Sequence, residues 1–231
     1  MPLRTSETPL WAERVLVADA AQRLAAAGLV RSSSGNVSAR SGELVAVSPT
    51  GAELATLTPE DVTVVDLDGR VMDETALAPT SELSLHLAVH AERGDGAVIH
   101  THAPKATAVG CVLTELPCIH YEMLALGGAV RVAPYSTFGS ADLARDALAG
   151  LEGKNAVILA NHGTVTAGPD MASALNATEL LEWSAGLYLD ATRLGTPHTL
   201  DADQQRAVIE TAIRSNYGTT RPATETGERD E

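Results

Sequence analysis

Aromatic side chains, cysteines and lysines are scarce in this chain of 231 residues. With two Trp, four Tyr and one Phe, the core must be built largely from Ala, Val and Leu, and an apolar fraction of 45% is enough for a sizeable one. The two cysteines, Cys111 and Cys118, form no CxxC pair. A thiol redox motif or a cysteine zinc site is therefore not indicated, and we expect both thiols to be reduced and structural.

Positive charge is also in short supply. The chain has sixteen Lys and Arg residues and thirty Asp and Glu residues, which gives a formal net charge of −14. This negative charge argues against nucleic acid or an anionic membrane as a partner. No run approaches the ~18 apolar residues of a membrane-spanning helix. The first fifteen residues carry acidic side chains and lead into an amphipathic pattern, which is not typical of a signal peptide. We expect a cytoplasmic protein.

Helical and extended patterns alternate along the chain. Apolar spacing and end signals predict helices over 9–28, 79–96, 140–151, 170–195 and 201–215, and a further one beginning near Pro104. Short β-rich runs predict strands within 43–49, 62–73, 97–102, 129–135 and 155–168. This order is typical of one layered α/β domain with a mixed sheet. The absence of GxGxxG and P-loop motifs leaves a nucleotide site without support.

The segment AVIHTH, residues 97–102, places two of the seven histidines at the end of a predicted buried strand. Side chains alternate between the faces of a strand, so His100 and His102 project to the same side while Thr101 points into the packing on the other. Two imidazoles spaced in this way can hold one metal ion. The pair alone is a weak signal, because histidines can also be buried simply as hydrogen-bonding groups.

Two other positions strengthen the metal hypothesis. His162 follows the apolar strand of NAVILA, and the next residue is a glycine, which lets the backbone approach closely. Glu82 lies in the first turn of the helix predicted after Pro79, with Thr80 or Ser81 as its cap. Three imidazoles with one carboxylate or water form a zinc-type site, and nitrogen and oxygen donors also suit Mn²⁺, Co²⁺ or Fe²⁺.

A rival ligand set lies within one helix. Glu82, His86 and His90 are spaced i, i+4 and i+8 and share a face. The sequence HLAVH lacks the glutamate that a zincin carries after its first histidine. We therefore favour His86 and His90 as packing or surface histidines.

Two segments of small polar residues, SSSGNVS and SPTG, are interpreted as turns that follow apolar runs. Successive backbone N–H groups in such turns, together with hydroxyls, form concave sites for anions. The helix start at PTSE adds free amides and the positive end of a helix dipole. These segments explain how an acidic protein could bind a phosphorylated substrate.

Taken in order, these segments resemble the class II aldolase/adducin family, and within it most closely the aldolases of L-fuculose 1-phosphate. The matching words are SSGNVSAR, SPTG, PTSELSLH, VIHTHAPKATA, IHYEMLALGGAVRVAPYSTFGS and ILANHGTVTAG, spread over roughly residues 10–195. The resemblance implies a three-layer αβα sandwich with a mixed, largely antiparallel sheet. It implies one domain over residues 1–217 and a homotetramer with interfacial active sites. Residues 218–231 lack apolar content, and we expect them to form a mobile tail.

The resemblance also assigns roles. The metal ligands fall on His100, His102 and His162 with Glu82, and the catalytic carboxylate also falls on Glu82. A tyrosine acid supplied by the neighbouring subunit falls on Tyr121. The phosphate cradle falls on Gly35, Asn36, Thr50, Gly51, Thr80 and Ser81. At position 80 the fuculose enzymes typically carry serine, but the hydroxyl is kept.

The implied reaction is zinc-dependent, reversible cleavage of a ketose 1-phosphate to dihydroxyacetone phosphate and a short aldehyde. Other members of the family are 5-deoxyribulose-1-phosphate aldolases, ribulose-5-phosphate 4-epimerases, methylthioribulose-1-phosphate dehydratases and sugar-acid phosphate decarboxylases. Glutamate at position 82 favours the aldolase, because the epimerase typically carries aspartate there. A non-enzymatic adducin-like module predicts lost ligands, and an amidohydrolase predicts a larger barrel.

Overall fold

The computed structural model describes residues 9–72, 76–94 and 96–218. The expected mobility of the tail concerns residues that lie, except for Gly218, outside the described ones. The elements are α1 (Trp11–Ala26), β1 (Asn36–Ser41), β2 (Leu44–Val47), the short 3-10 helix η1 (Leu54–Thr56), β3 (Thr63–Asp66), α2 (Leu83–Arg93), β4 (Gly96–Thr101), α3 (Pro104–Gly110), β5 (Glu115–Leu116), the 3-10 helix η2 (Tyr121–Leu126), β6 (Val130–Ala133), α4 (Ala141–Gly150), β7 (Ala156–Leu159), β8 (Gly163–Gly168), α5 (Met171–Leu194) and α6 (Ala202–Ser215).

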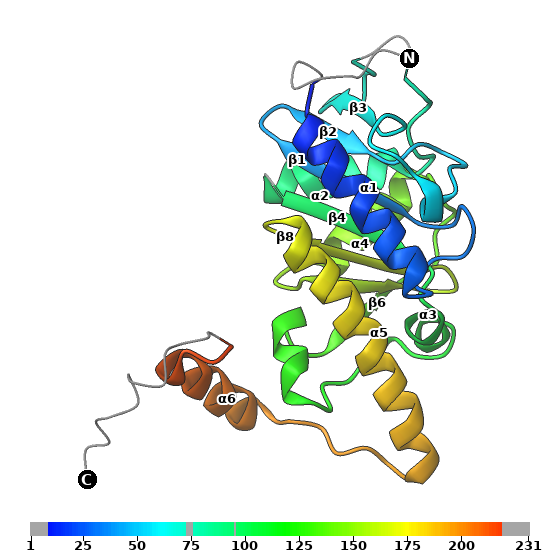
Figure 1. Cartoon of the computed structure of the whole chain (residues 1–231). Coiled ribbons are helices and arrows are strands. Elements are labelled where there is room, and N and C mark those ends of the chain that lie inside the picture. The colour runs from blue at the N-terminus through cyan, green and yellow to red at the C-terminus, as the bar shows by residue number, and fades with distance from the viewer. Residues whose placement is uncertain (1–8, 73–75, 95, 219–231) are drawn as a thin grey trace.

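The strands form one eight-stranded sheet in the order β3-β2-β1-β4-β8-β7-β6-β5. Among the described residues, β6 and β7 pair in parallel, and the other neighbours pair antiparallel. Helices α1, α3 and α5 pack on one face, and α2 and α4 pack on the other (Figure 1). The predicted three-layer αβα sandwich with a mixed, largely antiparallel sheet is confirmed.

The core divides between the two faces because side chains alternate along each strand. On β4, Ile99 packs with α1 and its neighbours, whereas Val98 packs with α2 and α4. His100 has the parity of Val98, so its side chain lies on the α2 side of the sheet. Thr101 lies on the other side, fully buried, and its hydroxyl bonds that of Thr164 at 2.8 Å.

Strand β1 corrects the interpretation of SSSGNVS as a turn alone. The segment Asn36–Ser41 is a central strand that pairs with both β2 and β4. Val37 and Ala39 face the α1 core, but Asn36 and Ser38 are buried on the α2 side with polar partners. A strand whose second buried face is polar carries a weak hydrophobic signal, which is why its pattern resembles a loop.

The α2 cap also differs from the prediction. Glu82 itself occupies the N-cap position of α2, and its side chain makes no capping hydrogen bond to the described residues of the helix. The Thr80 hydroxyl accepts a hydrogen bond from the Glu82 N–H at 3.3 Å. The Glu82 side chain is therefore released from helix capping and is available to the site.

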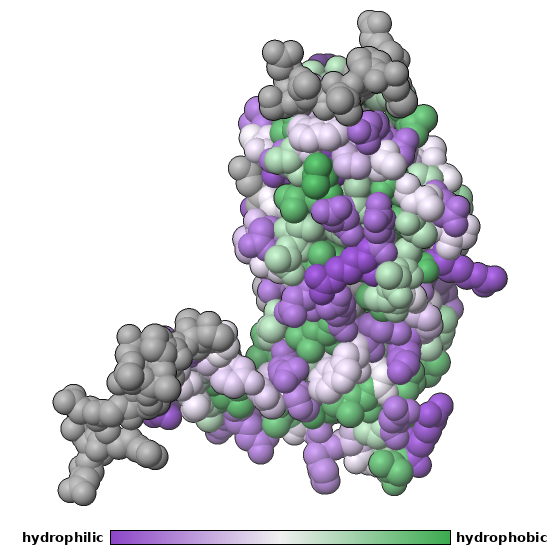
Figure 2. Space-filling model, in the orientation of Figure 1, coloured by the Kyte–Doolittle hydropathy of each residue, from purple (hydrophilic) through white to green (hydrophobic). Residues whose placement is uncertain are grey.

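Helix α6 stands apart from the body of the fold. It packs against η2, follows the long connection after α5, and buries none of its residues (Figure 1). On the face of the molecule shown in Figure 2, hydrophilic and hydrophobic residues are interspersed. Among the described residues, no helix combines the length and apolar character needed to cross a bilayer.

Candidate metal centre and active site

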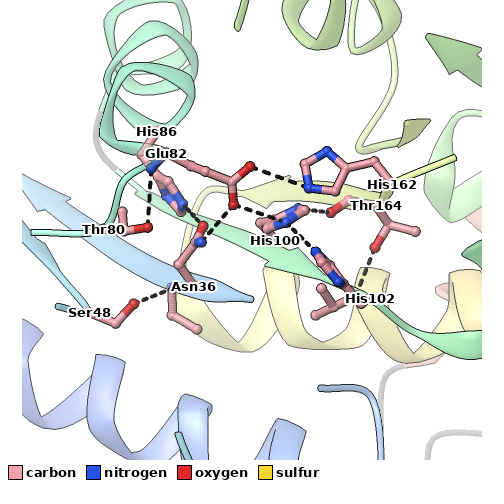
Figure 3. A network of polar contacts seen from close by, with 11 residues as sticks. Asn36, Ser48, Thr80, Glu82, His86, His100, His102, His162 and Thr164 are labelled. Carbon is pink, nitrogen blue, oxygen red and sulfur yellow. Dashed lines mark hydrogen bonds and ion pairs between the residues drawn. The ribbon is translucent and has the colours of Figure 1, made fainter. Parts of the chain in front are cut away.

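The predicted site residues converge because several strands end at the same edge of the sheet. Since β4 and β8 are antiparallel, the end of β4 lies beside the start of β8, with Thr101 paired to Thr164. The start of β1 lies on the other side of β4, with Asn36 paired to His100. Helix α2 begins over the same edge, so the HxH segment, the NHG turn and Glu82 meet there (Figure 3).

His100, His102 and His162 form one cluster. Each can present a ring nitrogen such that the three atoms lie within 4.8 Å of one another. The ring centroids are 4.9–5.1 Å apart, and the Nε2 atoms of His100 and His102 are 3.1 Å apart. Figure 3 shows the rings pointing toward a common centre beside the Glu82 carboxylate.

The hydrogen bond behind His100 determines which nitrogen faces the cluster. Its Nδ1 lies 2.9 Å from the carbonyl oxygen of Thr164. A carbonyl can only accept, so Nδ1 carries a proton, and Nε2 is the ring nitrogen that faces the cluster and can ligate a metal once it is deprotonated. Burial, and then the charge of His100, lower the pKa of His102 to about 4, and the same causes lower that of His162. Neutral imidazoles are the form that binds metals.

Glu82 completes the group as a buried carboxylate. Its Oε2 accepts a hydrogen bond from Asn36 Nδ2 at 2.9 Å and lies 3.1 Å from His100 Nε2. Its Oε1 lies 3.5 Å from His162 Nε2. Burial raises the pKa of the Glu82 carboxyl, but hydrogen bonds from His100 and Asn36 and the charge of His100 outweigh that effect and hold it well below the ordinary value.

These residues fit a divalent cation. Glu82 Oε1 is buried and has no hydrogen-bond partner in the part of the chain that the structure describes, although a buried carboxylate oxygen normally has one. His100 Nε2 lies 3.1 Å from both His102 Nε2 and Glu82 Oε2, so three potential metal-binding atoms lie close together. Three imidazole nitrogens with a carboxylate are a donor set for zinc, and also for manganese, cobalt or iron.

A cavity of about 320 Å³ opens beside this cluster. All six residues predicted for the phosphate cradle line it together with Glu82, His102 and His162; they are Gly35, Asn36, Thr50, Gly51, Thr80 and Ser81. The two loops are joined by backbone bonds from Thr50 N to Ala78 O at 3.0 Å and from Thr80 N to Ser48 O at 3.2 Å. These bonds hold small polar residues from distant parts of the sequence around one space.

Two glycines allow close packing here. Gly35 has φ 105°, and a Cβ there would lie 2.9 Å from the His100 carbonyl oxygen. A Cβ on Gly163 would collide with the Thr101 carbonyl oxygen and lie 2.9 Å from the His102 ring. The close approach expected of the glycine after His162 is confirmed.

Asn36 occupies the cavity wall in an unexpected way. Its side-chain amide is held between Glu82 and His86, with Oδ1 2.5 Å from His86 Nε2. The amide is thus bonded to the carboxylate instead of projecting freely toward the cradle.

The loop after β6 and the turn after β7 supply further residues of the cavity wall. Tyr135, Ser136, Phe138 and Asn161 also line the cavity. Because β6 and β7 are parallel, with Ala133 paired to Leu159, the chain after β6 must lie beside the NHG turn after β7. Recognising that parallel pair in the sequence would have located them.

Tyr121 lies elsewhere in the same chain. It begins η2 and lines an apolar groove of about 990 Å³ between η2, α5 and α6, not the cavity of Glu82. Its hydroxyl is 3.2 Å from that of Tyr217, and this hydrogen bond, with smaller charge effects, raises the pKa of Tyr121 to about 12. Tyr121 thus remains protonated at neutral pH.

The rival helical ligand set is not assembled. His86 and His90 are buried and both bond Ser38, and neither belongs to the histidine cluster found among the described residues. They are packing histidines, and a surface location is wrong.

Both cysteines are free, Cys118 buried and Cys111 exposed.

Comparison with known proteins identifies the family. Residues 15–189 match the profile described as Class II Aldolase and Adducin N-terminal domain. The chain belongs to the class II aldolase and adducin family.

Two curated class II aldolase relatives cover most of this chain. The 5-methylthioribulose-1-phosphate/5-deoxyribulose-1-phosphate aldolase of Rhodospirillum rubrum is 36% identical over 83% of this chain and 87% of its own. The L-fuculose phosphate aldolase of Escherichia coli K12 is 33% identical over 79% of this chain and 85% of its own. A solved structure of an L-fuculose 1-phosphate aldolase superposes with a TM-score of 0.82 at 30% identity, covering 91% of this chain and 98% of that one.

Proposed function

We propose that this protein is a divalent-metal-dependent class II aldolase that reversibly cleaves a ketose 1-phosphate to dihydroxyacetone phosphate and a short aldehyde. The observation that carries the proposal is the buried Glu82 carboxylate beside three imidazoles, with Oε1 lacking a hydrogen-bond partner among the described residues, at the wall of a cavity lined mostly by small polar residues. The aldolase names of its relatives support the same reaction class.

In this proposal His100, His102 and His162 hold the metal, and zinc suits their donor set best. When bound, the metal supplies Lewis-acid stabilisation of the negative charge that develops on the substrate's carbonyl oxygen as the carbon–carbon bond breaks. The hydrogen bond from His100 Nδ1 to Thr164 keeps that imidazole in the ligating tautomer.

Glu82 is the proposed proton carrier at the nucleophilic carbon. Its ionised carboxylate has Oε2 fixed by Asn36 and Oε1 free, so Oε1 is the atom that takes or returns the proton. The cradle of Gly35, Thr50, Gly51, Thr80 and Ser81, with Asn36 at its wall, is proposed to bind the substrate phosphate through amides and hydroxyls. No lysine is needed for a Schiff base.

The proton on the aldehyde oxygen is assigned to Tyr121 of a neighbouring subunit. Two observations support this assignment. Tyr121 is protonated and 38% exposed, and it does not line the cavity of its own chain. A homotetramer with interfacial sites, each domain comprising residues 1–217, is the assembly we propose; a cytoplasmic location is proposed with it.

A second candidate substrate is 5-deoxyribulose 1-phosphate. It is favoured by the Rhodospirillum rubrum relative, whose name includes that activity. The two substrates share the ketose phosphate end, which the cradle would bind, and differ at the aldehyde end.

The experiment is to incubate zinc-loaded protein with L-fuculose 1-phosphate, 5-deoxyribulose 1-phosphate, 5-methylthioribulose 1-phosphate and ribulose 5-phosphate, and to measure released dihydroxyacetone phosphate. We expect release from a ketose 1-phosphate and its loss after chelation, with recovery on adding zinc. Epimerised or dehydrated product without dihydroxyacetone phosphate would contradict the aldolase assignment.

A further inference from the structure

Behind Glu82, on the side away from the cavity, lies a row of buried polar side chains that the proposed reaction does not use. His86 and His90 of α2 and Ser38 of β1 are at most 1% exposed. Ser38 Oγ is 2.7 Å from His86 Nδ1 and 2.8 Å from His90 Nε2. His86 Nε2 is 2.5 Å from Asn36 Oδ1, and Asn36 Nδ2 is 2.9 Å from Glu82 Oε2. Figure 3 shows the end of this row, from His86 through Asn36 to Glu82.

The carboxylate determines the direction of every bond in the row. An ionised carboxylate can only accept, so Asn36 must present its NH₂ group to Glu82 Oε2. The amide oxygen of Asn36 therefore faces His86, and because that oxygen can only accept, the proton of His86 must be on Nε2.

The second nitrogen of His86 is then an acceptor. Burial, followed by the charges of His90 and His100, lowers the pKa of His86 to about 3, so the ring is neutral. Its Nδ1 accepts from the Ser38 hydroxyl, and the Ser38 oxygen in turn accepts from His90 Nε2. All bonds run one way, from His90 to the carboxylate.

We propose that His86, held in one tautomer by Ser38 and His90, is a positioning residue that fixes the amide of Asn36 and thereby the orientation of the Glu82 carboxylate. With Oε2 held, Oε1 is the oxygen left for the proton that the reaction moves. This role rests on the proposed function of Glu82, but the bond directions do not.

Each member of the row depends on its neighbour for a hydrogen-bond partner. An apolar side chain at position 86 would leave the buried Asn36 Oδ1 and Ser38 hydroxyl without the partners that His86 provides. If Ser38 lacked its hydroxyl, His86 could move its proton to Nδ1. Asn36 would then turn its oxygen toward Glu82, and two acceptors would face each other.

Two substitutions at one position separate positioning from packing. In His86→Gln the side-chain amide reaches the place of Nε2 and can still donate to Asn36, whereas in His86→Asn it reaches only the place of Nδ1. We expect His86→Asn to lower kcat by about 10- to 100-fold, as is typical when groups that orient a site ligand are lost. We expect KM for the ketose phosphate and bound zinc to be unchanged, and His86→Gln to retain most of kcat.

The control is Thr178→Val. It removes a buried hydroxyl whose partner, Thr166 at 2.6 Å, lies on the opposite face of the sheet. This variant should lose unfolding stability without losing kcat. Equal losses of kcat in His86→Gln and His86→Asn would overturn the positioning role.

A second readout needs no substrate. Nitrogen-15 NMR of the full-length protein, with His86 assigned by comparison with His86→Gln, reports which ring nitrogen carries the proton. We expect Nε2 in the unsubstituted protein and a shift toward Nδ1 in Ser38→Ala. A proton on Nδ1 in the unsubstituted protein would overturn the inference even if the protein is an aldolase. A correct tautomer in a protein that releases no dihydroxyacetone phosphate would support the bond directions and refute the proposed function instead.

Discussion

Gly163 lies where β8 begins against the end of β4, directly beside the imidazoles. A Cβ at this position would meet the Thr101 carbonyl and would lie 3.2 Å from the His100 ring. We expect Gly163→Ala to separate the two strand ends and to weaken zinc binding by about 10-fold or more. Competition with a chromophoric chelator measures the affinity. The control is Gly195→Ala, where a Cβ meets nothing within 4 Å, and a comparable loss of affinity there would contradict this explanation.

Glu82 also makes stability depend on pH. Its folded-state pKa lies below the ordinary value of 4.5, so the unfolded chain takes up the proton first as the pH falls. The stabilisation contributed by the carboxylate is therefore present above about pH 4.5 and is lost as the pH falls toward the folded-state pKa. We expect metal-free protein to lose unfolding free energy below that pH more steeply than Glu82→Gln, as measured by urea titration.

The same substitution separates chemistry from metal binding. Glu82→Gln should retain zinc on the three imidazoles while proton exchange into dihydroxyacetone phosphate is abolished, as followed by deuterium uptake. Exchange at the unsubstituted rate in this variant would remove Glu82 from its role.

At the residue scale, the sequence predicted the imidazole cluster but not the bonds behind it. Strand alternation alone places His100 and His102 on one side, and the glycine after His162 indicates a close approach. The partner of His86 could not be predicted in the same way, because helical spacing shows that a residue faces inward but not which atom it meets. Asn36 was assigned to the phosphate cradle by the family resemblance, which did not show that its amide bonds Glu82.

At the scale of elements, the helix caps give a matched pair of tests. Ser140 caps α4 and accepts from the Leu143 N–H, and Asp201 caps α6 and accepts from the Gln204 N–H. Helix α4 buries Leu143 and its neighbours in the core, whereas α6 buries none of its residues. We expect Ser140→Ala to cost about 1 kcal/mol in the free energy of unfolding. Asp201→Ala should leave that quantity unchanged within about 0.5 kcal/mol, in urea titrations followed by tryptophan fluorescence. A larger loss for Asp201→Ala than for Ser140→Ala would contradict the burial argument.

Helix and strand prediction succeeded where apolar periodicity was strong and failed where polar groups are buried. The long helix α5 follows its pattern from the Asp170 cap to Gly195. Strand β1 does not show such a pattern, because Ser38 on its inner face bonds two histidines of α2. The periodicity of a segment reports burial in an apolar environment, so a strand that faces a polar network escapes it.

At the scale of the whole molecule, some apolar side chains on α6 and directly after it are exposed among the described residues. Ile213 is 72% exposed and Tyr217 is 67% exposed, beside the apolar groove that also contains Tyr121. Local sequence patterns predict the helix but not the surface that covers its apolar side chains. The proposed homotetramer supplies such a surface.

Subunit mixing tests this assembly together with the role of Tyr121. Glu82→Gln and Tyr121→Phe should each be nearly inactive as pure oligomers. If a site takes Glu82 from one subunit and Tyr121 from its neighbour, co-refolding equal amounts of both variants leaves about one site in four with both native residues. Activity should therefore reappear on mixing, and light scattering should give the mass of four chains. Because Glu82 and Tyr121 of one chain line different cavities, a site complete within one subunit would need Tyr121 to move. In that case mixing the two variants would restore no activity.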